Sequence, residues 1–103
     1  MSNKYRQQVL PTEVDTNDKD YIFLCCGGDS LGHALASFNS FKRAKEYLIN
    51  MDGIKYYSRY SISAIPLEAD LEKKPYFTVF YDDKFKTDNY NKRIEKAMNE
   101  SFD

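Results

Sequence analysis

The stretch IKYYSRYSISAIPL, residues 54–67, decides the fold. Its even positions from Ile54 to Ala64 are mostly apolar, whereas the odd positions from 57 to 63 are Tyr, Arg, Ser and Ser. Because neighbouring side chains on a strand point to opposite faces, this alternation predicts a β-strand with one buried face. Pro66 ends the strand. We assign the even positions to a layer of helices and the odd positions to the opposite face.

Three other segments of the chain also predict strands. Residues 21–26 (YIFLCC) form a short, continuous apolar run, which indicates a strand buried on both faces. Residues 76–81 (YFTVFY) indicate another strand, with apolar side chains on both faces. Residues 33–38 form a weaker returning strand after the turn at Gly27 and Gly28. The four strands therefore form two antiparallel hairpins.

Two helices are predicted, one after each hairpin. Asn39 or Ser40 can cap the first helix, and Gly53 ends it. Thr87 or Asp88 can cap the second helix. The first helix has an apolar stripe at spacings of three and four, formed by Phe41, Ala44 and Leu48. The predicted inner face of the second helix consists of Tyr90, Ile94, Ala97, Met98 and Ser101.

The order ββαββα predicts a two-layer α+β domain, with a four-stranded antiparallel sheet and both helices on one face. This order is a circular permutation of the ferredoxin-like βαββαβ arrangement. Residues 1–20 are polar and predict a flexible or loosely docked N-terminal arm, followed by a single domain over residues 21–103.

Composition excludes several classes of protein. A net charge of −1 over 103 residues gives neither a basic nucleic-acid footprint nor an acidic tail. No apolar run is long enough for a membrane span or a signal peptide, so we expect a cytoplasmic protein without a membrane partner. The adjacent Cys25 and Cys26 lack metal-ligand spacing, so we expect free thiols, no metal and no cofactor.

The tetrapeptide Gly28-Asp29-Ser30-Leu31 resembles the nucleophile block of the GDSL-type esterases. That resemblance would make Ser30 a nucleophile and His33, the single histidine, its base. The chain lacks the D-x-x-H block that supplies the base and its orienting acid in that family. Gly27 and Gly32 also half-match a phosphate-binding loop, but His33 stands where its lysine is required. We therefore predict a hairpin turn, no catalytic residues and no enzymatic activity.

The stretch KYYSRY, residues 55–60, interleaves basic and aromatic side chains. This pattern supports an alternative function, nucleic-acid or nucleotide binding through phosphate contacts and base stacking. The residues of this alternative are Lys55, Tyr57, Arg59 and Tyr60. Tyrosines at every second position are, however, more often part of cross-strand packing.

The preferred function follows from the two faces of the sheet. Helices on one side leave the other face with apolar side chains, which monomers rarely expose over a large area. Alternation alone does not decide whether Phe77, Val79 and Tyr81 or Tyr76, Thr78 and Phe80 point there. We predict protein-interaction residues on this face: Tyr57, Arg59, Phe77 and Tyr81. The partner is an outside protein or a second copy in a homodimer, unless the N-terminal arm covers the face.

The strings FNSFKRAKEYL (residues 38–48) and YYSRYSISAIPLEAD (residues 56–70) resemble a pattern in small uncharacterised proteins of phages and bacteria. In these proteins a helix is followed by a strand that closes on I-x-x-I-P-L. The resemblance implies a small accessory protein, encoded by a phage or a bacterium, that modulates a host or a defence system without an active site. It transfers no functional residues.

Overall fold

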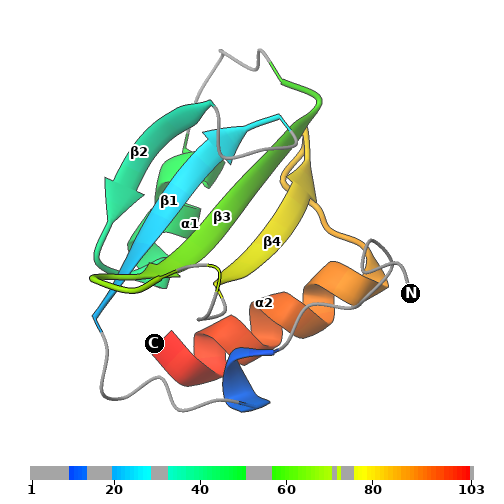
Figure 1. Ribbon diagram of the computed structural model, residues 1–103. Helices are drawn as coiled ribbons and strands as arrows, with labels where there is room; N and C mark the ends of the chain where they lie inside the picture. Colours follow the sequence, from blue (N-terminus) through cyan, green and yellow to red (C-terminus); the bar gives the residue numbers. More distant parts are fainter. Residues whose placement is uncertain are drawn as a thin grey trace.

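Four strands form one antiparallel sheet in the computed structural model, which describes residues 10–13, 20–28, 33–50, 57–70, 72 and 76–102 (Figure 1). The sheet order is β2-β1-β3-β4. The elements are η1 (Pro11–Glu13), β1 (Tyr21–Gly27), β2 (Ala34–Phe38), α1 (Phe41–Ile49), β3 (Arg59–Pro66), β4 (Phe77–Asp82) and α2 (Asn89–Phe102). The α+β class and the ββαββα order of a permuted ferredoxin-like arrangement are confirmed.

The core lies between the sheet and the two helices. Cys25, Ile62 and Val79 are opposite one another on β1, β3 and β4, and all three side chains are fully buried. They pack in one cluster with buried side chains of α1 and α2, so both helices cover the same face of the sheet. Figure 1 shows α1 behind the strands. The helical members of the cluster are Phe41, Ala44, Leu48, Ile94 and Met98.

The starts of the helices follow their capping residues. The Ser40 hydroxyl accepts a hydrogen bond from the backbone N–H of Arg43 at 3.3 Å. The Asp88 carboxylate accepts one from the backbone N–H of Asn91 at 2.8 Å. Ser40 and Asp88 are thus the residues that occupy the two predicted capping positions. Helix α1 ends at Ile49, before the predicted glycine, which lies outside the described residues.

The buried face of α2 differs from the predicted one at its first turn. Tyr90 is 38% exposed, whereas Asn91 is buried. The side-chain oxygen of Asn91 accepts a hydrogen bond from the backbone N–H of Phe80 at 2.9 Å. A polar side chain thus holds the start of α2 against β4, which a search for apolar spacing does not detect. The predicted positions Ile94, Ala97 and Met98 are buried.

Strand β1 is not buried along both faces, contrary to the prediction, and β4 has one buried and one half-buried face. Along β4, buried Phe77, Val79 and Tyr81 alternate with half-buried Thr78 and Phe80. On β1, Ile22 and Leu24 are also half-buried. A continuous apolar run resembles a strand covered on both sides, but here the second side lacks a covering layer of described helices.

The described part of the N-terminal arm lies against a helix. Pro11 is buried, Leu10 packs against the core cluster, and η1 lies beside α2 (Figure 1). This docking site is on the helical side of the molecule, so residues 10–13 do not cover the opposite face of the sheet.

Both cysteines are free and buried, on opposite faces of β1. The Cys25 thiol lies 3.6 Å from the carbonyl oxygen of Ala44 on α1, to which it donates. Burial raises the pKa of Cys25 to about 12, with a smaller contribution from Cys26. Burial also raises the pKa of Cys26, although a hydrogen bond with Ser61 opposes this shift.

The raised pKa of Cys25 predicts a loss of stability in alkali. An unfolded thiol ionises near its ordinary pKa of 9.0, whereas native Cys25 stays protonated to about pH 12. Stability is therefore full below pH 9 and falls as the pH rises towards 12. At pH 10 this thiol should account for a loss of about 1 kcal/mol. In urea unfolding at pH 8 and pH 10, Cys25→Ala should flatten the pH dependence more than the control Cys26→Ala. Equal slopes in wild type and Cys25→Ala would contradict this account.

Candidate functional site

The side chains that point away from the helices form three cross-strand rows, which we call the open face. Ile22 is opposite Ile65, Leu24 is in a row with Ser63 and Thr78, and Cys26 is in a row with Ser61 and Phe80. Together, the open face comprises Ile22, Leu24, Cys26, Ser61, Ser63, Ile65, Thr78 and Phe80.

The side chains at the centre of the open face are small and buried, and those at its margin are apolar. Cys26, Ser61 and Ser63 are buried, and the hydroxyls of Ser63 and Thr78 are hydrogen-bonded at 2.8 Å. The large apolar side chains around this centre are only half-buried: Ile22, Leu24, Ile65 and Phe80. Polar groups within the face are thus paired with each other, while apolar surface remains at its edges.

Two residues of opposite charge lie opposite each other at one end of the open face. Arg59 lies opposite Asp82 on the paired strands β3 and β4. The Arg59 guanidinium lies over the ring of Phe80, 4.5 Å from its centroid. Arg59 also helps to lower the pKa of Asp88, although hydrogen bonds from Asn91 are the main cause. Opposite charges and a stacked aromatic ring are therefore adjacent at this margin.

The structure places the predicted interaction residues in different environments. Arg59 is exposed at the end of the open face, but Phe77 and Tyr81 point into the core, where they are 0% and 6% exposed. The predicted surface positions on β4 were therefore wrong. The register of β3 with β4 turns Thr78 and Phe80 towards the open face instead.

Tyr57 is also absent from the open face. It precedes β3, and its ring packs against the core cluster and edge-on to Tyr60, with 5.9 Å between the ring centroids. The ring occupies the space that a Cβ atom would need at Gly27. The alternation of β3 does not extend back to Tyr57, because the strand begins only at Arg59.

The residues of the nucleic-acid alternative do not form one surface. Tyr60 is fully buried and cannot stack on a base, and Tyr57 is half-buried against Gly27. Lys55 lies outside the described residues. Of the described members, Arg59 alone is exposed.

The glycine-rich turn is described only in part. Gly28 has a φ of 81°, the left-handed conformation expected of a glycine in a turn. His33 is exposed, and its ring lies 5.6 Å from that of Tyr57. Asp29, Ser30 and Gly32 lie outside the described residues. Within the described ranges, no three His, Cys, Asp or Glu side chains gather as a metal site.

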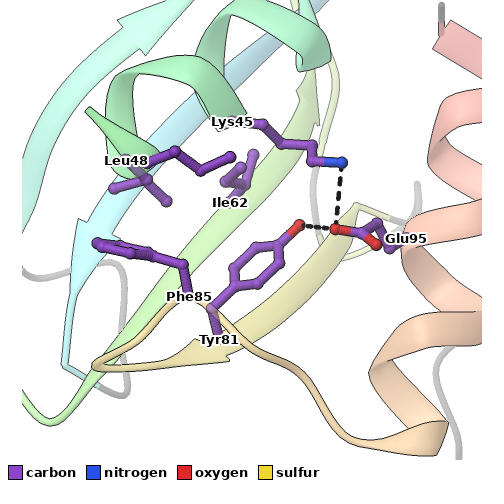
Figure 2. Close-up of a pocket in the computed structure, with 7 residues that line it drawn as sticks. Lys45, Leu48, Ile62, Tyr81, Phe85 and Glu95 are labelled. Atoms are coloured by element: carbon purple, nitrogen blue, oxygen red, sulfur yellow. Dashed lines mark hydrogen bonds and ion pairs between the residues drawn. The ribbon is translucent and has the colours of Figure 1, made fainter. Parts of the chain in front are cut away.

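A cavity of about 160 Å³ lies on the helical side of the sheet, and the sequence did not indicate it (Figure 2). The Tyr81 hydroxyl donates a hydrogen bond to Oε2 of Glu95 at 2.7 Å, and Nζ of Lys45 lies 3.3 Å from the same oxygen. Burial, and then the bond to Glu95, raise the pKa of Tyr81. The cavity is lined by Lys45, Leu48, Ile49, Ile62, Tyr81, Phe85 and Glu95.

The turn after β4 holds one wall of this cavity. Oδ1 of Asp82 accepts hydrogen bonds from the backbone N–H groups of Lys84 and Lys86, which lower the pKa of Asp82. Within this turn Phe85 adopts a φ of 60°, which is uncommon for a residue with a side chain. Its ring packs on that of Tyr60 at a centroid distance of 5.1 Å. The turn thus fixes the ring at the edge of the cavity.

Comparisons of this chain with protein-family models, curated proteins and solved structures found no match. None of the helices formed by the described residues has the length and apolar character needed to cross a membrane.

Two tyrosine hydroxyls near the cavity predict opposite effects on stability. Among the buried side-chain polar atoms of the described residues, the Tyr60 hydroxyl alone has no hydrogen-bond partner. Tyr60→Phe should therefore raise the free energy of unfolding by about 1 kcal/mol, because it removes an unpaired buried group. Tyr81→Phe should lower it by about 1 kcal/mol, because the bond to Glu95 is lost. Chemical denaturation measures both changes. Equal destabilisation by the two substitutions would show that the Tyr60 hydroxyl is paired.

Proposed function

We propose that this chain is a non-enzymatic protein-interaction protein that acts through its open face. The observation that supports this function is the half-buried apolar margin of Ile22, Leu24, Ile65 and Phe80 on a face that no described helix covers. Burial of such side chains in a complex is favourable, by roughly 25 cal/mol for each Å² of apolar surface. The neighbouring Arg59, stacked on Phe80, is of a type enriched at interfaces.

A second copy of the chain is the partner that the face fits best. An interface with two-fold symmetry must be self-complementary, since the same patch serves both copies. The apolar margin meets this condition, and Arg59 and Asp82 at its end can each face the opposite charge on the other copy. A typical interface uses about 800 Å² per partner, a small part of the total surface of 6993 Å².

At the edge strand β4, hydrogen bonds within the chain oppose the addition of a further strand. They therefore favour binding through the open face over strand addition at this edge. The backbone N–H of Phe80 donates to Asn91, and the backbone carbonyl of Phe80 accepts from the Thr87 hydroxyl at 2.6 Å. Both groups are thus occupied at the outer edge of the sheet. A protein of this kind would bind its partner in the cytoplasm, and the resemblance to small phage and bacterial proteins implies an accessory role.

Light scattering after size-exclusion chromatography tests this function. We expect the wild type to have twice the 12.1 kDa mass of the chain. Phe80→Lys should weaken the dimer by at least about tenfold, because association would bury an unpaired charge beside Arg59. The matched control is Tyr90→Lys, which makes the same kind of change at an exposed aromatic residue of α2. Circular dichroism confirms that both variants fold.

Two outcomes would contradict the proposal. A wild type that stays monomeric throughout a concentration series does not associate through this face. A folded Phe80→Lys variant that dimerises as well as Tyr90→Lys places the interface elsewhere on the molecule.

A further inference from the structure

We propose that the cavity beside Tyr81 binds a small neutral molecule, a single aromatic ring that carries a hydrogen-bond donor. This site lies on the helical side of the sheet, apart from the open face, and its test does not depend on the oligomeric state.

The size and lining of the cavity set the body of the ligand. Its volume is about 160 Å³, similar to the roughly 150 Å³ of an apolar cavity that binds benzene. Aliphatic walls come from α1 and β3, and Phe85 and Tyr81 contribute aromatic rings (Figure 2). An aromatic ring packs well against such rings in tilted or offset arrangements. The aliphatic walls are Leu48, Ile49 and Ile62.

The polar end of the cavity sets the functional group. Tyr81 and Lys45 both approach Oε2 of Glu95 (Figure 2). The Glu95 side chain lines this end of the cavity, so a ligand N–H or O–H can donate to its carboxylate. Burial and the bond to Glu95 raise the pKa of Tyr81, so its hydroxyl stays neutral. The charges of Lys45 and Glu95 cancel, which favours a neutral ligand over an ion.

The cavity has the properties of a binding site rather than of a closed packing defect, because it is open to solvent and its walls are fixed. Ile49 lines the cavity and is 59% exposed, so this side of the cavity reaches solvent. Phe85 is held by the turn that Asp82 organises, and Tyr81 is held by its bond to Glu95. A ligand would therefore enter a site whose walls are already ordered, which reduces the entropic cost of binding.

Titration with phenol, followed by ¹H–¹⁵N NMR of the full chain, tests the proposal. Phenol should shift the amide signals of cavity residues saturably, with a Kd of about 1 mM for a ligand of this size. Toluene, which replaces the hydroxyl with a methyl group, should bind about fivefold more weakly, because it cannot donate to Glu95.

A substitution at the mouth localises the binding. Ile49→Trp places a larger side chain at the exposed rim, so it should fold and weaken phenol binding by at least about tenfold. The control is Lys42→Trp, at another exposed position of α1, which should leave the Kd unchanged.

Three results would overturn the proposal. Absence of saturable shifts with either ligand would mean that solvent alone fills the cavity. Toluene binding as tightly as phenol would remove the role of the Glu95 carboxylate. Unchanged binding in Ile49→Trp would place the ligand elsewhere.

Discussion

The antiparallel pairing of β1 with β3 is the constraint on which the rest of the structure depends. It runs without a break from Tyr21 opposite Pro66 to Gly27 opposite Tyr60. Both strands lie at the centre of the sheet, so their register decides which side chains face the helices. A slip of one residue would place Ser61 and Ser63 in the core and turn Ile62 outward. The apolar core and the open face are therefore two consequences of one register.

The segment that joins β4 to α2 connects this sheet with both candidate sites. Asp82 organises the turn that carries Phe85 to the cavity, and Asp88 caps the helix that carries Glu95. Between them, Thr87 binds the backbone carbonyl of Phe80, whose side chain lies on the open face. Short polar side chains, each bonded to nearby backbone, thus fix the outer edge of the sheet and leave its face available.

Local patterns were enough to predict the four strands and the two α-helices. The alternation in residues 54–67 identified β3 and correctly assigned Tyr60, Ile62 and Ala64 to the core. The spacing of Phe41, Ala44 and Leu48 identified the inner face of α1. These signals succeed because the period of a strand or a helix acts between residues that are close in sequence.

The candidate sites could be predicted only in part, because they depend on contacts between distant segments. In β4, large side chains occupy both faces, so only its pairing with β3 shows that Phe80 faces outward and Tyr81 inward. The ring of Tyr57 lies on the core side because Gly27, thirty positions earlier in the sequence, leaves space for it. The cavity joins Lys45 to Glu95, fifty positions apart, and no motif links these two residues.

The most direct test of the central claim, that the register of β1 and β3 creates an interaction face, is an isotope-filtered NOE experiment. The sample is a mixture of labelled and unlabelled chains. The account predicts intermolecular contacts from the methyl groups of Leu24 and Ile65 to the ring of Phe80, and none from those of Ile62 or Leu48, which lie in the core. Intermolecular contacts confined to exposed apolar residues outside the open face, such as Ile49 or Leu67, would contradict it.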